Sequence, residues 1–137
     1  MSIVEILPFH KKLHSELTIP GSKSYTNRAL LLAALSKGKT VLTNVLESDD
    51  TKVMVSALKN MGIKIYKQSS RYEIMGTGGK FKTPTKTLHL GNAGTAVRFL
   101  SSALTLLPNA TIVTGDERMQ QRPIQDLVAA LNNLGAK

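Results

Sequence analysis

The stretch Pro20-Gly-Ser-Lys-Ser-Tyr-Thr-Asn-Arg-Ala-Leu-Leu-Leu-Ala-Ala-Leu35 joins a tight turn to an amphipathic helix. Pro20-Gly21 predicts the turn, and leucines and alanines at helical spacing predict a helix over 22–35 that is closed by Lys37-Gly38. The first turn of a helix has unpaired backbone N–H groups and the positive end of the helix dipole. Hydroxyl and ammonium groups at positions 22–24 therefore predict an anion-binding site at this helix start, which we call an anion seat.

A simpler interpretation of these three residues is an ordinary helix cap followed by a solvated lysine. Asn27 and Arg28 follow within one turn, directly before the apolar stripe. An arginine at this place can lay its stem on packed structure and turn its guanidinium back towards Lys23. The combination favours a phosphate or carboxylate site over a plain cap.

The bulk composition limits the class of protein. The 137 residues are 42% hydrophobic, enough for the core of one domain or of part of a larger one. The net charge of +9 predicts an anionic partner, which leaves nucleic acid, an anionic membrane or anionic small molecules. Many lysines are scattered among predicted turns and hairpins, a pattern typical of a generally basic surface. No apolar run reaches the ~20 residues of a membrane span, and the N-terminus lacks a secretion signal.

The absence of cysteine excludes disulfides and thiolate metal sites and fits a reducing compartment. His10, His14 and His89 are not at ligand spacing, so we expect surface or packing histidines and no metal. We expect a soluble cytoplasmic protein that needs no cofactor and binds neither membrane nor nucleic acid.

Strands and helices alternate along the chain, and their expected order is as follows. We expect strands at 2–7 and 13–19, the helix already described, a strand at 40–46, a helix capped by residues 48–50 and closed by Gly62, a hairpin of 63–66 with 71–75, and a basic linker at 76–84. A strand at 87–90, a turn at 91–95, a helix at 96–107, a strand at 110–114, a loop at 115–122 and a helix opened by Pro123 and closed by Gly135 complete the series. Asp49 and Asp50 fit helix caps better than general acid–base groups.

These elements form a strand–helix–strand–helix–strand–strand unit that occurs twice. Setting Gly21 on Gly91 also sets Arg28 on Arg98. The first unit continues into a hairpin after its second helix, whereas the second unit stops two residues after Gly135. A unit without its last two strands leaves helix faces uncovered and a strand edge unpaired. We therefore expect these residues to be the front part of a longer enzyme.

The run Gly91-Asn-Ala-Gly-Thr-Ala-Val-Arg98 is a second candidate anion seat. Gly94 allows the backbone to approach a ligand, Asn92 can offer its amide, and Thr95 can cap the following helix. The alternative is an ordinary glycine-rich turn. The match to residues 24–28 in the first unit favours a ligand, and any side chain at Gly94 would then occupy the volume of the anion.

The run Gly115-Asp-Glu-Arg-Met-Gln-Gln-Arg-Pro123 places two arginines before a helix. Arg122 is the better ligand candidate, because Pro123 restricts its backbone at the mouth of that helix. Arg118 could instead pair with Asp116 or Glu117 on the surface.

Taken together, the motifs Pro-Gly-Ser-Lys-Ser-x-x-Asn-Arg at 20–28, Leu-Gly-Asn-Ala-Gly-Thr-Ala-x-Arg at 90–98 and Gly-x-x-Arg-Met-x-x-Arg-Pro-Ile at 115–124 resemble the enolpyruvyl transferases. The closer match is to the branch that acts on shikimate 3-phosphate. The resemblance implies an α/β (α+β) fold of two domains, each an inside-out barrel of three βαβαββ units. Residues 1–19 would then give strands to the domain completed by the distant C-terminal part. Residues 20–137 would form a partial N-terminal domain, with unit one at about 20–83 and a truncated unit two at about 84–137.

The resemblance also implies the reaction and its residues. The enolpyruvyl group of phosphoenolpyruvate passes to the 5-hydroxyl of shikimate 3-phosphate through a tetrahedral intermediate that expels phosphate. By motif position, Lys23 contacts both substrates and is the catalytic candidate, and Ser24 and Arg28 bind shikimate 3-phosphate. The Gly94 backbone and Arg122 bind phosphoenolpyruvate. Asn92, Thr95 and Arg98 support them, and Phe99 stands where some members have proline.

The family's Asp and Glu acid–base residues correspond to positions beyond Lys137, so we expect no turnover from these residues alone and a monomer for the full-length enzyme. Two rivals remain. An enolpyruvyl transferase acting on a UDP-amino sugar usually has a catalytic cysteine, which this chain lacks. A basic nucleic-acid-binding module would interleave aromatic and basic residues, and Tyr25, Tyr66 and Tyr72 do not follow that pattern.

Overall fold

The structure is a computed structural model that describes residues 3–8, 10–12 and 14–136. The first unit contains α1 (Lys23–Leu35), β1 (Lys37–Leu42), α2 (Asp49–Asn60), β2 (Lys64–Gln68) and β3 (Arg71–Thr77). The second contains β4 (Leu88–His89), α3 (Gly94–Leu104), β5 (Val113–Thr114), α4 (Glu117–Gln120) and α5 (Gln125–Asn133).

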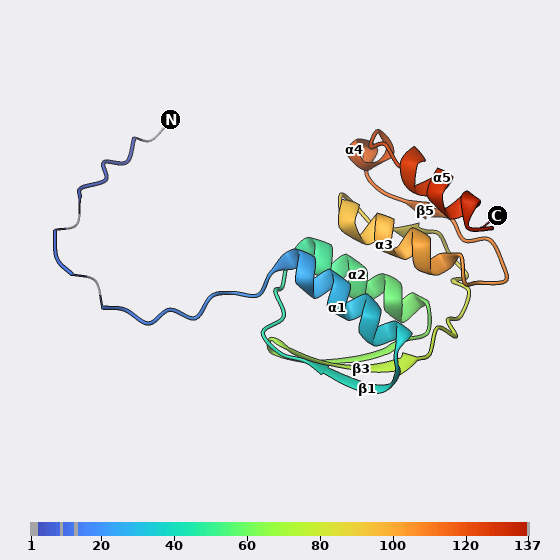
Figure 1. The fold of residues 1–137 in the computed structure, drawn as a ribbon, viewed down its shortest axis with the longest axis horizontal. Coiled ribbons are helices and arrows are strands. Elements are labelled where there is room, and N and C mark those ends of the chain that lie inside the picture. Colours follow the sequence, from blue (N-terminus) through green and yellow to red (C-terminus); the bar gives the residue numbers. More distant parts are fainter. Residues whose placement is uncertain (1–2, 9, 13, 137) are drawn as a thin grey trace.

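The elements are stacked in layers (Figure 1). A three-stranded sheet of order β1-β3-β2, antiparallel throughout, lies under α1 and α2. Helix α3 packs on both of these helices and in turn contacts β5, which pairs in parallel with β4. Helices α1, α2 and α3 therefore pack together and join the two units, and each unit has its own sheet.

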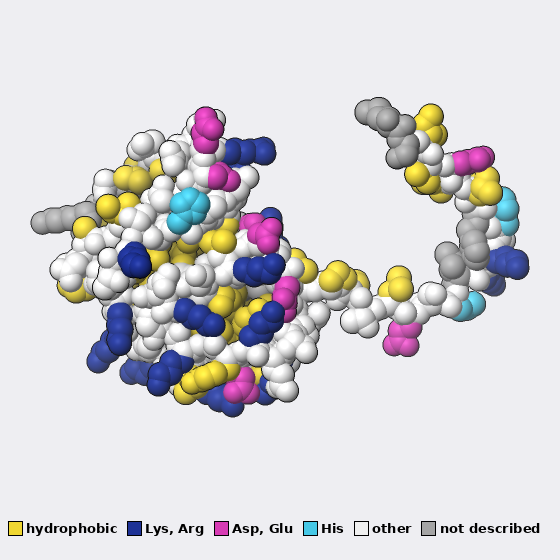
Figure 2. Space-filling model, turned by 180° about the vertical axis from the view of Figure 1, so that it is seen from behind, with side chains coloured by type: hydrophobic (Ala, Val, Ile, Leu, Met, Phe, Trp, Pro, Cys, Tyr) yellow, Lys and Arg dark blue, Asp and Glu magenta, His cyan; other side chains and the backbone are white. Residues whose placement is uncertain are grey.

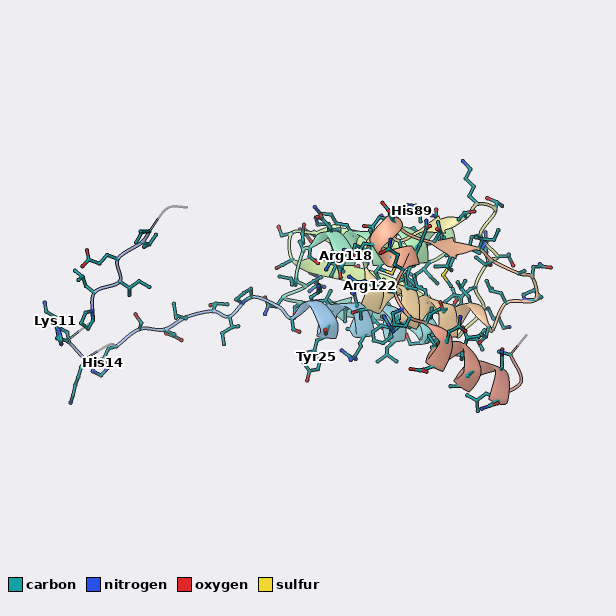
Figure 3. All side chains as sticks on the ribbon, turned by 90° about the horizontal axis from the view of Figure 1, so that it is seen from above. Lys11, His14, Tyr25, His89, Arg118 and Arg122 are labelled. Carbon is teal, nitrogen blue, oxygen red and sulfur yellow. The ribbon has the colours of Figure 1, made fainter. Side chains whose placement is uncertain are left out.

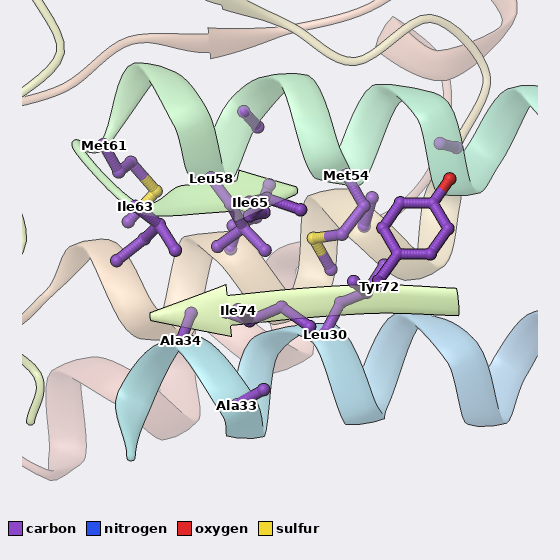
Figure 4. Packing of buried hydrophobic residues seen from close by; sticks show 14 of the residues in the cluster. Leu30, Ala33, Ala34, Met54, Leu58, Met61, Ile63, Ile65, Tyr72 and Ile74 are labelled. Carbon is purple, nitrogen blue, oxygen red and sulfur yellow. The ribbon is translucent and has the colours of Figure 1, made fainter. Parts of the chain in front are cut away.

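The core forms where α1 and α2 face β3 (Figure 4). Leu30, Met54, Leu58 and Ile74 are completely buried between these elements, and Leu100 of α3 belongs to the same cluster. Burial of an aliphatic side chain of this size contributes about 1.5–3 kcal/mol relative to leaving it exposed. The predicted apolar stripes of α1 and α2 thus become the centre of the fold.

Small residues let the sheet approach α1 closely. A Cβ atom added to Gly76 of β3 would collide with the backbone oxygens of Ala33 and Ser36 at the end of α1. Helix α1 ends at Leu35, and its C-cap Ser36 is already extended, so Gly38 lies inside β1 with a φ of +84° instead of closing the helix. The expected role of Gly38 as helix terminator is therefore wrong, because the chain passes directly from α1 into β1.

Several element boundaries differ from those expected. Strand β1 covers 37–42 instead of 40–46, because Asn44 has a φ of +53° that ends the strand. Helix α3 starts at Gly94 instead of Ala96 and ends three residues early, and the short helix α4 occupies part of the expected loop at 115–122. Pro123 precedes the N-cap of α5 instead of opening the helix, and its carbonyl accepts a hydrogen bond from Arg98.

The expected strands at 2–7 and 13–19 are absent from the described residues. Residues 3–8, 10–12 and 14–19 form an extended arm that leads away from the body (Figure 1). Apolar side chains along the arm are exposed, with Ile3 at 97% and Leu17 at 83% (Figure 2). A strand needs a neighbour to pair its backbone groups, and no strand of the described chain lies beside the arm. Ser2 and Leu13 lie outside the described residues.

The predicted repeat is visible in the local contacts. Arg28 donates to the carbonyl four residues earlier, that of Ser24, and Arg98 does the same to Gly94. In the second unit, Leu88 and His89 of β4 pair with Val113 and Thr114 of β5. In the first unit, the side-chain amide of Asn44 donates to the carbonyl of Ile19, and these two residues are as far apart in the sequence as Leu88 and Val113.

Among the described residues, no helix combines the length and apolar character that crossing a membrane requires.

Candidate anion-binding site

Helices α1, α2 and α3 run in the same direction, with their N-termini at the same end of the layer (Figure 1). The first turns of α1 and α2 are joined by an ion pair between Lys23 Nζ and Asp50 Oδ2 at 3.3 Å. Parallel helices add the positive ends of their dipoles at one end, which makes that end attractive to an anion. The candidate residues of the first two motifs all lie at this end.

The first seat is the opening turn of α1. Ser22 caps the helix, and its Oγ accepts from the backbone N–H of Tyr25. The Arg28 guanidinium donates from Nη1 to the carbonyl oxygen of Ser24 at 3.2 Å. Arg28 is therefore turned back towards the helix start, as its position in the motif predicts.

The guanidinium of Arg28 also lies over the ring of Phe99, with 5.2 Å between Cζ and the ring centroid. Phe99 belongs to α3, so this contact ties the first seat to the helix that carries the second. Sequence reasoning did not identify this partner. Its signal would have been the repeat, which places α3 beside α1 in space.

Asp50 is a second residue that sequence reasoning did not assign to the site. The N-cap of α2 is Ser48, in a capping box with Thr51, so Asp49 and Asp50 lie in the first turn and do not act as the cap. The carboxylate of Asp50 instead faces the Lys23 ammonium, whose side chain is about half exposed. The ammonium group of Lys23 therefore already has an acidic partner within the chain, Asp50.

The second seat is the start of α3, where Gly94 lies beside two guanidinium groups. A Cβ atom added to Gly94 would lie 2.6 Å from Nη1 of Arg122 and 3.5 Å from Nη1 of Arg98. Gly94 is buried and its φ is not positive, so the need for glycine comes from space and not from backbone conformation. The bare backbone at Gly94 lets two cations meet the N-terminus of a helix.

Arg98 holds this second seat together. Its Nη1 approaches the Gly94 carbonyl oxygen at 3.5 Å, and its Nη2 donates to the Pro123 carbonyl oxygen at 2.9 Å. Because Pro123 follows Arg122 directly, this bond fixes the loop that carries Arg122. Within the described part of the chain, neither Arg98 nor Arg122 forms an ion pair with a carboxylate. Two close guanidiniums without a carboxylate are the arrangement that an anion can neutralise.

The expected cap at Thr95 is wrong, because Thr95 is the second residue of α3. The N-cap is Ala93, which has no side-chain hydrogen bond to the first turn. The N-terminus of α3 therefore lacks the side-chain cap that Ser22 and Ser48 give to α1 and α2. Asn92 is exposed beside this turn, and its backbone carbonyl accepts from the N–H of Gly94.

The two arginines of the third motif differ in their surroundings. Arg122 is half-buried against Gly94, whereas Arg118 is exposed on α4. Asp116, one of the two expected partners of Arg118, instead caps α4 by accepting from the N–H of Met119 at 2.8 Å. A hollow of about 240 Å³ opens beside Arg98 and Arg122, lined also by Gln120 and Ile124. Lys23 and Arg28 do not line it.

The described candidates thus fall into two groups. Lys23, Ser24 and Arg28 lie at the start of α1, and Gly94, Arg98 and Arg122 lie at the start of α3. Phe99 connects the groups through its contact with Arg28. Asn27 is completely buried, and neither polar atom of its side chain has a partner among the described residues.

The histidines are widely separated. His14 lies on the arm and His89 on the body (Figure 3). In the ranges that the structure describes, no group of three His, Cys, Asp or Glu side chains is placed to hold a metal ion.

The sequence profile of the family described as EPSP synthase (3-phosphoshikimate 1-carboxyvinyltransferase) matches residues 9–137. The chain is 52% identical over 128 residues to 3-phosphoshikimate 1-carboxyvinyltransferase of Shewanella loihica, a match that covers 91% of this chain. It is 47% identical over 140 residues to the protein of the same name from Sulfurovum sp., covering 100% of this chain. Among solved structures, EPSP synthase from Acinetobacter baumannii superposes on 88% of this chain with a TM-score of 0.84 and 32% identity.

The matched proteins are much longer than this chain. The chain spans 30% of the length of the Shewanella protein and 33% of the Sulfurovum protein. It covers 28% of the solved Acinetobacter chain.

Proposed function

Because the chain belongs to the EPSP synthase family, we propose that it forms one wall of an enolpyruvyl transfer site. There, the enolpyruvyl group of phosphoenolpyruvate would pass to the 5-hydroxyl of shikimate 3-phosphate, with release of phosphate, in aromatic amino acid biosynthesis. The relatives that carry this name match the chain over 90% or more of its length. They extend well beyond it, so the remaining walls of the site would come from parts of the fold that this chain does not span.

The observation that carries the proposal is the convergence of Arg98 and Arg122 on the uncapped start of α3. Both substrates carry phosphate, and phosphoenolpyruvate also carries a carboxylate. A guanidinium binds such groups through two parallel hydrogen bonds, each stronger than a neutral one. We assign phosphoenolpyruvate to the Gly94 backbone and Arg122, with Asn92, Thr95 and Arg98 in support.

We assign shikimate 3-phosphate to the start of α1. Ser24 offers a hydroxyl and Arg28 a guanidinium that already points to the helix start. Lys23 lies between the N-termini of α1 and α2 and would contact both substrates. Its pairing with Asp50 keeps the ammonium in place, and it would exchange or share that partner when an anionic ligand arrives.

The chemistry that these residues supply is electrostatic. Expulsion of phosphate from the tetrahedral intermediate moves negative charge onto the leaving group, and fixed cations that stabilise this charge accelerate the step. Proton transfer requires acid–base side chains, which in this family would lie outside the present residues. Positioned groups on both sides of a closed site are needed for turnover. We therefore propose that these 137 residues alone are inactive.

The same family membership underlies three wider proposals. Residues 1–19 would join the domain that is completed elsewhere, consistent with the exposed apolar side chains of the arm. The complete enzyme would be a cytoplasmic monomer that uses no cofactor. The spread of Lys and Arg over the face seen in Figure 2, without one continuous basic stripe, supports small anionic substrates over nucleic acid.

The test is a titration of the purified chain with shikimate 3-phosphate, followed by NMR and calorimetry. We expect Arg28→Ala and Lys23→Ala each to weaken binding by about 1.5–3 kcal/mol, which is roughly tenfold or more, because each removes a charge-assisted hydrogen bond. Gly94→Ala should leave this affinity intact and weaken phosphoenolpyruvate binding. Failure of the wild type to bind shikimate 3-phosphate, or salt-dependent DNA binding at nanomolar affinity, would contradict the proposal. Phosphate release by the wild-type chain alone would refute its inactivity.

A further inference from the structure

Arg28 is an exposed arginine whose side chain is nevertheless held in two places. Its Nη1 donates to the Ser24 carbonyl oxygen at 3.2 Å, and its Cζ lies 5.2 Å from the centroid of the Phe99 ring. A cation within about 6 Å of an aromatic centroid is attracted to the negative face of the ring. The guanidinium is therefore fixed from α1 by a carbonyl oxygen and from α3 by an aromatic ring.

Phe99 is suited to hold such a contact. The residue is half-buried and packs against the hydrophobic core, so its ring is anchored on one side while Arg28 covers the other. A free arginine side chain loses rotamer entropy when a ligand immobilises it. A ring that restricts the guanidinium beforehand removes part of that loss from the binding step.

We propose that Phe99 is a positioning residue that holds the Arg28 guanidinium ready for an anionic ligand. This inference rests on the proposed function, because it takes Arg28 as a ligand of shikimate 3-phosphate. Phe99 does not itself contact the ligand. It acts through Arg28, and a residue without a ring at this position leaves the arginine held only by the Ser24 carbonyl.

The neighbour of Phe99 extends the same principle to the second seat. Arg98 donates to the Pro123 carbonyl and so fixes the loop of Arg122. Two consecutive residues of α3 therefore hold the two arginines that bind the two substrates, Arg28 through a ring and Arg122 through a backbone bond.

The experiment compares Phe99→Leu, Phe99→Tyr and Arg28→Ala with the wild-type chain. Shikimate 3-phosphate affinity is measured by NMR titration, and the ring-current shift of the Arg28 side-chain protons is recorded without ligand. We expect Phe99→Leu to weaken binding about two- to fivefold and to abolish the ring-current shift, since leucine keeps the apolar contact without the π face. Phe99→Tyr should retain both properties. Phe81→Leu is the matched control, because Phe81 is also a half-buried phenylalanine at the edge of the core, and its binding should match the wild type.

The outcomes separate this inference from the proposed function. Lack of binding by the wild type would count against the proposed function. If Arg28→Ala weakens binding while Phe99→Leu binds like the wild type, the site stands and the role of Phe99 is overturned. If Phe99→Leu does not fold, the role of Phe99 is tested instead by the ring-current shift of the wild-type chain and by the shikimate 3-phosphate affinity of Phe99→Met. Arg28 protons without a ring-current shift in the wild type would overturn the contact itself.

Discussion

Glu73 is an acidic residue of β3 that forms ion pairs with two basic residues of the sheet. Its carboxylate lies 2.9 Å from Lys39 Nζ on β1 and 3.1 Å from Nη2 of Arg71 on its own strand. Hydrogen bonds from Lys39 and then Arg71 lower the pKa of Glu73 below its ordinary value of 4.5. On β2, the hydrogen bond to Glu47 similarly raises the pKa of Lys67. All three ion pairs are accessible to solvent, so their contribution to stability is small and screened by salt.

The lowered pKa of Glu73 predicts the sign of a pH effect. A carboxyl with a lower pKa in the folded state stabilises the fold above its unfolded pKa, and this stabilisation is lost as pH falls through the folded value. We therefore expect Glu73→Gln to lower the thermal midpoint slightly at neutral pH and to flatten its fall below pH 4.5, where the variant and the wild type converge. Thermal denaturation across this range measures it, with Glu5→Gln on the arm as control. An unchanged acid slope in Glu73→Gln would show that the ion pairs do not persist in solution.

At the scale of single elements, helix α2 illustrates how caps set the site. Ser48 Oγ accepts from the N–H of Thr51 at 3.3 Å, and Thr51 Oγ1 accepts from the N–H of Ser48 at 2.9 Å. This reciprocal cap defines where α2 begins, and Asp50 lies in the turn that follows. The orientation of Asp50 towards Lys23 thus depends on a cap outside the candidate site.

We expect Ser48→Ala to destabilise the chain by about 1 kcal/mol, within the usual range of 0.5–2 kcal/mol for loss of a side-chain cap. Urea denaturation monitored by circular dichroism gives the free energy of unfolding. Ser56→Ala is the matched control, because Ser56 is an exposed serine in the middle of the same helix. Equal stability of the two variants would mean that the capping box does not stabilise α2.

At the scale of the whole molecule, the arm and the body are nearly independent. The arm meets the body through the hydrogen bond from the Asn44 side-chain amide to the Ile19 carbonyl, at 3.3 Å and on the surface. Beyond it, Gly21 packs so tightly on the backbone of Asn44 that a Cβ atom could not be added. Among the described residues, the body therefore begins at Pro20-Gly21.

Removal of residues 1–19 should consequently leave the body folded. One exposed hydrogen bond contributes about 0.5 kcal/mol, so we expect the thermal midpoint to change by roughly 2–4 °C. The shortened chain should also associate less, because exposed apolar side chains such as Ile3 and Ile6 are removed. Calorimetry and sedimentation velocity check the two statements. A cooperative loss of structure on truncation would instead show that the arm packs on the body in solution.

Much of this fold could be predicted from the sequence because its signals are local. Apolar spacing and caps place α1 and α2, the Gln68-Ser-Ser70 turn signal places the hairpin of β2 and β3, and the fold class agrees with that of the solved relative. The expected strands at 2–7 and 13–19 did not form among the described residues, because a strand also needs a neighbouring strand to pair with, and this partner is not a local signal. The cap expected at Thr95 is also wrong, because α3 already starts at Gly94 and its N-cap is Ala93.

The candidate site likewise has features that local sequence predicts and features that depend on distant parts of the chain. The sequence by itself identified the candidate residues: Lys23, Ser24, Arg28, Gly94 and Arg122 follow from motif and repeat. Only the tertiary structure decided their partners, which are Asp50 for Lys23, Phe99 for Arg28 and the Pro123 carbonyl for Arg98. The physical reason is range. Helix starts and turns depend on neighbours within a few residues, whereas these three contacts join groups on different elements and exist only once the helices have packed side by side.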